Sequence, residues 1–169
     1  MIHPIVKYGN EVLAKKVEPV TVSDGDLQKL IEDMFESMYA ASGVGLAAPQ
    51  IGVSRHIAVI DTSGGKDPKD RLVLVNPEII ATEGKQMEEE GCLSLPGVRE
   101  KCKRPAKATV RSLDRNGKEF TMTGEGLLAR AFCHETDHLN GRLFLTHLSS
   151  LKRELITRKI RKMMKKGEW

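Results

Sequence analysis

The stretch His134-Glu135-Thr136-Asp137-His138 constrains this chain more than any other. On a helix, residues four positions apart lie on one face, so His134 and His138 can offer two imidazoles to one metal ion. Glu135 can then reach a water in the open position of that metal, which is the arrangement of metal-assisted hydrolysis. Residues 127–133 are mostly apolar, which predicts a buried helix. Buried histidines without partners are costly, and a metal ion would account for them.

Length and composition favour one soluble domain. The 169 residues are enough for a substantial core, and 40% hydrophobic with 30% charged residues is ordinary for a globular protein. No apolar run approaches the roughly 18 residues that a membrane-spanning helix needs, so we expect no membrane contact. No charged-then-apolar leader opens the sequence, and three cysteines without framework spacing favour a reducing compartment. We therefore expect a cytoplasmic protein.

The positive charge is concentrated at the C-terminal end. Residues 150–169 hold eight Lys or Arg against two Glu, a net charge of +6, whereas the whole chain carries +4. The apolar residues here recur at helical spacing: Leu148, Leu151, Leu155, Ile156, Ile160, Met163 and Met164. We predict a helix whose apolar face docks on the body and whose basic face meets a polyanion.

Residues 23–42 predict a core-packing helix, capped by Ser23 or Asp24 and ended by Gly43. The loop that follows, residues 43–50, contains two glycines and two adjacent alanines, which allow a backbone to approach another group closely. Its last side chain, Gln50, is an amide that can donate to a developing oxyanion near a metal.

The remaining segments predict strands around the buried helix. Buried strands are expected over Arg55–Asp61 and Arg71–Val75, with Asn76-Pro77 ending the second. Lys103–Leu113 and Lys118–Thr123 alternate and are joined through an Asn-Gly hairpin turn. The strands do not alternate with helices as in a parallel sheet, which favours the α+β class.

Two histidines leave the expected site one protein ligand short. A thermolysin-like peptidase would supply a Glu near position 158, which is Arg158, and a metzincin would supply a His at the position of Phe144. Cysteine is the remaining candidate. Cys92, which follows a glycine, is favoured over Cys102 in a strand-like stretch and over Cys133, which points about 100° around the helix from its neighbour.

Three separated motifs resemble those of the peptide deformylases: Gly43-x-Gly45-x-Ala47-Ala48-x-Gln50, Glu90-Gly91-Cys92-Leu93-Ser94 and His134-Glu135-x-x-His138. The likeness runs from the N-terminal arm to about Ser149. It departs at Gly9-Asn10, where the family often has Pro-Asp. The resemblance implies an α+β fold with antiparallel or mixed sheets packed around a central metal-binding helix. It divides the chain into a catalytic part, residues 1–149, and a basic C-terminal helix of the same domain, residues 150–169.

The implied activity is removal of the N-formyl group from the initiator formyl-methionine of nascent polypeptides, with release of formate. By this resemblance, the metal ligands are Cys92, His134 and His138. Glu135 is the general acid and base, and the catalytic donors to the oxyanion are Gln50 and the backbone N–H of Leu93. The native ion is expected to be Fe²⁺, which Zn²⁺, Ni²⁺ or Co²⁺ can replace in purified protein.

The resemblance also implies how substrate and partners are bound. Five residues are expected to contact the formyl-methionyl peptide: Val44, Gly45, Arg99, Leu127 and Ala131. Near them, Glu88 and Arg130 are more polar than the walls of such a pocket often are, and they are candidates to pair with each other. The basic helix is expected to bind the ribosome through ribosomal RNA near the exit tunnel, and the protein to be a monomer.

Two other classes stay open on the sequence alone. One is a metallopeptidase of the H-E-x-x-H type, which the missing third ligand disfavours. The other is a catalytically silent, metal-binding homologue, which would typically lack Glu135 or one of the ligands.

Overall fold

The computed structural model describes all 169 residues, and it contains three α-helices and seven β-strands. The helices are α1 (Gly25–Ala40), α2 (Leu127–Leu139) and α3 (Ser150–Lys165). The strands are β1 (Gly45–Ala47), β2 (Ile57–Asp61), β3 (Arg71–Glu83), β4 (Gln86–Cys92), β5 (Leu95–Arg104), β6 (Lys107–Leu113) and β7 (Glu119–Glu125). Four short 3₁₀ helices complete the chain: η1 (Glu11–Ala14), η2 (Ala48–Ile51), η3 (Pro68–Asp70) and η4 (Phe144–His147).

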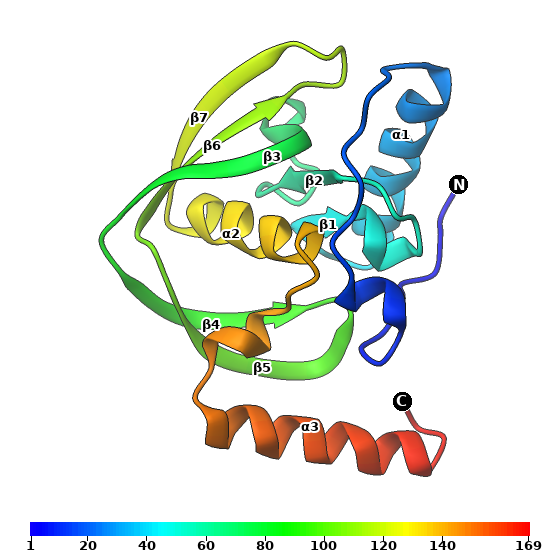
Figure 1. Cartoon of the computed structure of the whole chain (residues 1–169), viewed down its shortest axis with the longest axis vertical. Coiled ribbons are helices and arrows are strands. Elements are labelled where there is room, and N and C mark those ends of the chain that lie inside the picture. Colours follow the sequence, from blue (N-terminus) through cyan, green and yellow to red (C-terminus); the bar gives the residue numbers. More distant parts are fainter.

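Two antiparallel sheets enclose α2. The larger sheet has the strand order β1-β2-β3-β6-β7, and the smaller sheet is the β4-β5 hairpin. Figure 1 shows α2 between these two sheets and α3 beyond the hairpin. Apolar residues of α2, among them Phe132 and Leu139, pack with buried residues of β2, β3 and β6. The architecture is the α+β arrangement that the sequence predicts, with a helix inside the sheets.

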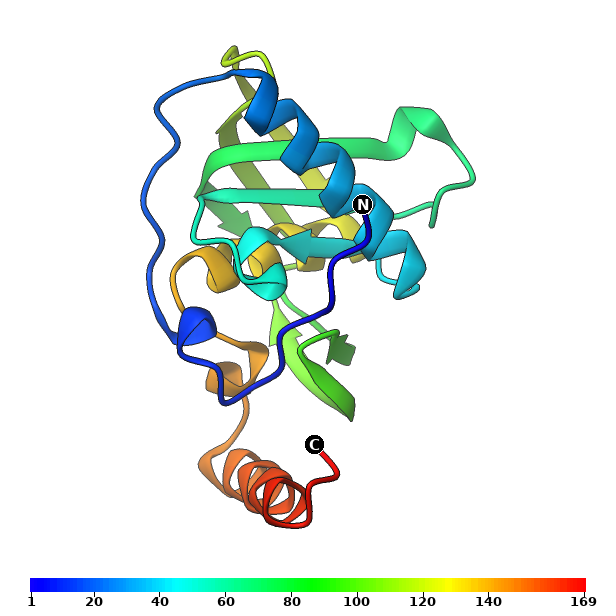
Figure 2. The ribbon, with the colours of Figure 1, turned by 90° about the vertical axis from the view of Figure 1, so that its right-hand side faces the viewer.

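Two further apolar clusters join the outer elements to this centre. One packs α1 against β1, η2 and β2 through residues such as Met34 and Leu46. The other joins β5, η4 and α3 through residues such as Leu95, Phe144 and Ile160. The N-terminal arm runs along the outside of the molecule and is interrupted by the short turn of η1, as Figure 2 shows. No helix of the chain is long and apolar enough to cross a membrane.

Helix α1 begins where the sequence indicates, because the Asp24 side chain accepts a hydrogen bond from the Leu27 N–H at 2.9 Å. Its end differs from the prediction. The left-handed conformation after the helix is taken by Ser42, with φ of 58°, and not by Gly43. Gly43 lies against another element, and a Cβ there would lie 2.8 Å from Cδ1 of Leu93. The glycine therefore makes room for a residue of the β4-β5 turn.

Two predicted strand boundaries are wrong. Strand β3 does not end at Asn76-Pro77 but continues to Glu83, through a register shift beside Asn76, whose φ is 51°. A bulge accommodates the proline there, because the residues at the shift are not paired in the ladder. The segment Lys103–Leu113 is not one strand, since β5 ends at Arg104 and β6 begins at Lys107 in the other sheet. Pro105, which lacks an N–H, lies in the break.

The C-terminal helix is present, but its apolar face is only partly covered. Ile160 is buried and Ile156 packs beside it, whereas Leu151 and Leu155 are 66% and 54% exposed. The prediction that the apolar face docks on the body is therefore confirmed for Ile156 and Ile160 and wrong for Leu151 and Leu155. Periodicity identified the helix but not the extent of its contact, because the body touches only one line of its side chains.

Candidate active site

Helix α2 and the end of β4 bring three nitrogen and sulfur atoms together. The Nε2 atoms of His134 and His138 lie 3.1 Å apart, since the two residues are one helical turn apart. Cys92, the last residue of β4, places its Sγ 3.3 Å from Nε2 of His138. One atom from each residue lies within 4.8 Å of the other two. The three residues expected to be ligands thus meet at one point, although they come from two distant segments.

This donor set fits a divalent metal ion. His138 is only 1% exposed, and its Nε2 lies 3.1 Å from Nε2 of His134 and 3.3 Å from Sγ of Cys92. Two imidazole nitrogens and a thiol at contact distance are poor partners for one another, yet together they form a common ligand set for Zn²⁺, Fe²⁺ and similar ions. An ion between them would satisfy lone pairs that the protein itself leaves unmatched.

The other two cysteines lie elsewhere. Cys102 is fully buried on β5, and burial raises the pKa of its thiol. Cys133 lines a separate cavity on the far side of α2, and burial raises the pKa of its thiol to about 11. Neither thiol belongs to the group of converging donor atoms, which disfavours both as ligands of the same ion.

A buried ion-pair network holds the first histidine in place. Nδ1 of His134 lies 2.7 Å from a carboxylate oxygen of Glu90, which also accepts two hydrogen bonds from the Arg104 guanidinium. Arg104 bonds in turn to Asp137, whose carboxylate contacts His147 at 2.8 Å. Such a partner fixes the ring orientation and directs Nε2 toward the common point.

The network also explains the charge state of Glu90. Burial alone would raise the pKa of this carboxyl, but hydrogen bonds from His134 and Arg104 outweigh it and lower the pKa to about 2. Sequence reasoning missed this residue as part of the site. The signal was present, because Glu90 and Cys92 are two apart on one strand and therefore face the same side. No local sequence pattern indicated that Arg104 belongs to the site, because its contact with Glu90 depends on the pairing of β4 with β5.

Glu135 points into the space beside the three donors. Its carboxylate is buried against Gly45, where a Cβ would lie only 2.5 Å from Oε2. The Oε1 atom has no hydrogen-bond partner in the protein. Burial raises the pKa of this carboxyl to about 7, which is suited to both accepting and returning a proton at neutral pH. A side chain at position 45 would thus displace the Glu135 carboxylate from this place.

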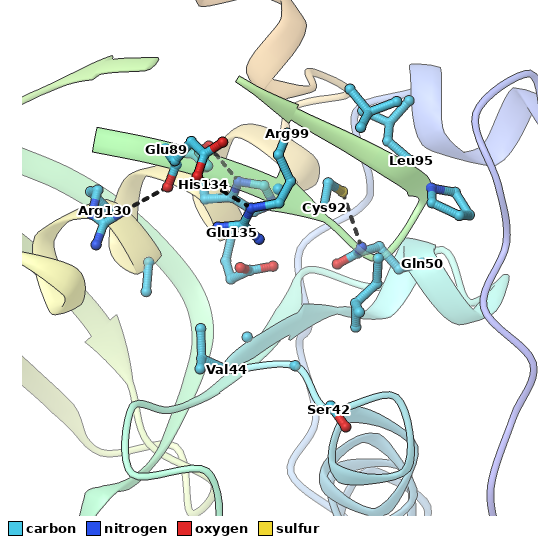
Figure 3. A pocket seen from close by; sticks show the side chains of 18 of the residues that line it. Ser42, Val44, Gln50, Glu89, Cys92, Leu95, Arg99, Arg130, His134 and Glu135 are labelled. Carbon is cyan, nitrogen blue, oxygen red and sulfur yellow. Dashed lines mark hydrogen bonds and ion pairs between the residues drawn. The ribbon is translucent and has the colours of Figure 1, made fainter. Parts of the chain in front are cut away.

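Gln50 is held by its surroundings with its NH₂ group toward Cys92. Its Oε1 accepts a hydrogen bond from the Ala47 N–H at 3.0 Å, and its Nε2 lies 3.2 Å from Ser94 Oγ and 3.6 Å from Cys92 Sγ. Figure 3 shows Gln50 and Cys92 facing each other across the site. Leu93 follows in the hairpin turn, and its N–H donates to no atom of the protein. The two donors expected for an oxyanion therefore border the same space.

All five residues expected to contact substrate line one cavity of about 650 Å³: Val44, Gly45, Arg99, Leu127 and Ala131. Gln50, Cys92, His134 and Glu135 border the same cavity. A pair between Glu88 and Arg130 does not form, since Arg130 donates instead to the backbone carbonyl of Glu89 at 3.2 Å (Figure 3). The thiol, one imidazole and a buried carboxylate line this cavity, and the second imidazole lies directly beside the first. Such a group is typical of a metal-dependent hydrolase.

Comparisons with known proteins agree with this class. The sequence model of one family, polypeptide deformylase, matches residues 2–154. A peptide deformylase of Acidobacterium capsulatum is 57% identical over 100% of this chain and 99% of its own length. One of Thermodesulfovibrio yellowstonii is 52% identical over 93% of this chain and 95% of its own.

Solved structures give the same result. A peptide deformylase from Legionella pneumophila superposes with a TM-score of 0.91 at 50% identity, covering 99% of this chain and 98% of that one. The enzyme from Thermus thermophilus gives 0.89 at 39% identity, covering 99% and 98%. The chain belongs to the polypeptide deformylase family. It is a hydrolase that removes the formyl group from nascent polypeptides, so the metallopeptidase alternative does not apply.

Proposed function

We propose that this chain carries out deformylation with one divalent metal ion held by Cys92, His134 and His138. The observation that carries the proposal is the convergence of these three donor atoms within 4.8 Å beside a buried carboxylate. The ion is Fe²⁺ in the native enzyme, and Zn²⁺, Ni²⁺ or Co²⁺ occupies the same ligands in purified protein. A divalent ion at this point supplies a Lewis acid that activates water and polarises the formyl carbonyl.

Glu135 carries out both proton transfers of the reaction. Glu135 removes a proton from the water that attacks the formyl carbon, and it returns that proton to the amine nitrogen as the carbon–nitrogen bond breaks. The products are formate and a peptide with a free amino group. A pKa of about 7 supports both transfers, because the carboxylate and the carboxylic acid are then both accessible near neutral pH.

Two donors stabilise the negative charge that develops on the formyl oxygen. Nε2 of Gln50 and the N–H of Leu93 both border the site, and the Gln50 amide is already oriented by Ala47 and Ser94. Donors fixed in advance do not have to reorganise as the charge forms, which is why such groups lower the barrier. Their contribution is expected in kcat more than in KM.

The cavity supports recognition of the methionyl side chain. Val44 and Leu127, which are 37% and 40% exposed, line it together with Ala131. Large apolar side chains left open at a cavity favour an apolar occupant, and methionine is the side chain that the initiator supplies. The backbone of Gly45 contacts the formyl-methionyl peptide, and Arg99, at the exposed rim, holds the chain beyond the methionine.

Helix α3 is the proposed contact with the ribosome. Six of its basic side chains, counting the cap residue, make no ion pair: Arg153, Lys159, Arg161, Lys162, Lys165 and Lys166. Unpaired cations on one exposed helix support phosphate-dominated binding to ribosomal RNA near the exit tunnel. The apolar cluster that Ile160 forms with Leu95 and Phe144 supports the proposal that residues 150–169 belong to one domain with residues 1–149. The enzyme acts as a cytoplasmic monomer.

The proposal is tested by formate release from a formyl-Met dipeptide. Metal-loaded protein should release formate, whereas the unformylated dipeptide should remain intact. Removal of the ion with a chelator should abolish release, and adding Ni²⁺ or Co²⁺ should restore it. Turnover that persists in fully metal-free protein would contradict the proposed mechanism.

A further inference from the structure

The N-terminal strap, residues 5–8, bridges the two loops that border the site. The Val6 N–H donates to the Gln50 carbonyl at 2.7 Å, and the Tyr8 N–H donates to the Ser94 carbonyl at 2.8 Å. Alternate amides of one extended segment therefore reach two different loops, one at η2 and one at the β4-β5 turn. Figure 2 shows the dark blue N-terminal segment passing beside η2 on its way toward this hairpin.

Side chains of the strap anchor it at both ends. Ile5 packs against the apolar cluster of α1, β1 and η2, and Tyr8 packs against the cluster of β5, η4 and α3. The carbonyl of Tyr8 also accepts a hydrogen bond from Nε1 of Trp169 at 2.9 Å. The strap is thus fixed to two separate parts of the core, and it does not line the cavity.

The two loops that it joins carry the two oxyanion donors. Gln50 lies in η2, and Leu93 immediately precedes Ser94 in the hairpin turn. Apart from the strap, a direct link between the loops is the side-chain contact from Gln50 to Ser94 and Cys92. We propose that the Val6 and Tyr8 amides set the spacing between Gln50 and Leu93, so that the strap is a positioning element for oxyanion stabilisation. This inference rests on the roles proposed above for Gln50 and Leu93.

The expected consequence is specific to the transition state. The charge on the formyl oxygen is greatest there, so a small displacement of one donor costs more in the transition state than in the bound substrate. Loosening the strap should lower kcat and leave KM and metal content unchanged, because no strap residue lines the cavity or belongs to the donor cluster. General loss of structure would instead change all three quantities.

At Tyr8, proline can remove the backbone N–H without removing the turn. It is the second residue of a turn closed by the Asn10 N–H and the Lys7 carbonyl at 3.2 Å, with Gly9 at φ of 107°. Proline is common at that position of a type II turn, so Tyr8→Pro removes the N–H while keeping the turn. Tyr8→Ala is the matched control, since it loses the ring but keeps the N–H. Lys7→Pro is a second control, because the Lys7 N–H donates to no protein atom.

We expect Tyr8→Pro to lower kcat by about tenfold relative to Tyr8→Ala, at equal KM and equal metal content. Lys7→Pro should match the wild type. Equal kcat for Tyr8→Pro and Tyr8→Ala would overturn the proposal. If Tyr8→Pro does not fold, as judged by circular dichroism, Val6→Pro compared with Val6→Ala makes the same test at the other loop.

A double-mutant cycle shows whether the strap acts through the donors. In a Gln50→Ala background, the kcat ratio between Tyr8→Ala and Tyr8→Pro should shrink toward one. A ratio that stays at its original value would contradict positioning of Gln50.

Failure of the strap proposal can be distinguished from failure of the proposed deformylase function. A wild type that releases no formate contradicts that function directly. The strap is then tested without activity by amide hydrogen exchange, in which Val6 and Tyr8 should be protected and Lys7 should exchange rapidly. Rapid exchange at all three amides would overturn the strap.

Discussion

In α2, eight of thirteen residues are buried, whereas in α3 only Ile160 of sixteen is. Three polar side chains of α2 have defined surroundings: His134 and His138 belong to the donor cluster, and Glu135 lies against Gly45. The basic groups of α3 are mostly unpaired and exposed to solvent. We therefore expect substitutions in α2 to act through single side chains, and those in α3 to act through the sum of many similar charges.

The difference has an energetic reason. A buried polar group loses its hydration, so its free energy depends on the few atoms placed around it, and changing one such group in α2 has a large effect. An exposed cation on α3 remains hydrated with or without a partner, so changing one has a small effect. The following substitutions test this contrast, in order of decreasing effect.

Replacing the base in α2 should have the largest effect. Glu135→Gln should keep the metal, because Glu135 is not among the three converging donors. It should lower kcat for a formyl-Met dipeptide by about 10²–10⁴-fold, the usual consequence of losing a positioned general base. Metal content measured on the same sample is the control, and near-normal turnover at full metal content would remove Glu135 from the mechanism.

Ile160 should be the one position of α3 that behaves like a core residue. Ile160→Ala should reduce the free energy of unfolding by about 2–5 kcal/mol, as large-to-small changes in a core do. The matched variant Leu155→Ala, in an exposed site, should change it by less than about 0.5 kcal/mol. Urea unfolding of both variants measures the difference. Equal losses in the free energy of unfolding would show that Ile160 does not anchor α3 to the body.

Glu90→Gln tests the partner of the first histidine. The neutral amide weakens the contact with Nδ1 of His134, so metal affinity should fall by about 10–100-fold. The nearby exposed Glu88, which makes no ion pair, provides the control Glu88→Gln with unchanged affinity. Competition with a chelator measures both, and an unchanged affinity in Glu90→Gln would leave the network without a role in the site.

Single charges of α3 should have the smallest effects. Each of Lys162→Gln and Lys165→Gln should reduce the slope of log affinity for ribosomes against log salt by about one unit, if each contacts a phosphate. Lys152, which pairs with Glu100 at 3.0 Å, is the control site for Lys152→Gln. Co-sedimentation over a salt series measures the slopes. Truncation is a poorer test because it removes Ile160 from its cluster.

Ribosome binding and catalysis should also be separable. Dipeptide deformylation should be unchanged in these charge variants, since no residue of α3 lines the cavity. Identical slopes for the variants and the wild type would contradict a phosphate contact through α3, while the catalytic assignment would stand.

The residues that the structure brings to the site were nearly all accessible from the sequence, for a physical reason. His134, Glu135 and His138 are joined by helical spacing alone, and Gly45 and Cys92 lie in short motifs whose small residues allow close approach. The family resemblance then placed these separate motifs in one site. Local patterns suffice where one element or one motif carries the chemistry.

The features that sequence reasoning missed depend on pairing between distant segments. Arg104 reaches Glu90 only because β5 pairs with β4, and the Val6 amide reaches Gln50 only because the arm folds back over η2. Strand β3 continues beyond Pro77 because a bulge accommodates the proline, whereas the proline by itself predicted that the strand would end there. The exposure of Leu151 depends on how far α3 lies from the body, which periodicity does not specify.

The proposed mechanism depends on one ion held by one sulfur and two imidazole nitrogens. The most direct measurement is X-ray absorption on Co²⁺-loaded protein, compared among the wild type, Cys92→Ser and Cys133→Ser. We expect one sulfur and two imidazole ligands in the wild type and in Cys133→Ser, and loss of the sulfur in Cys92→Ser. A sulfur ligand that survives Cys92→Ser, or a wild-type spectrum without sulfur, would contradict it.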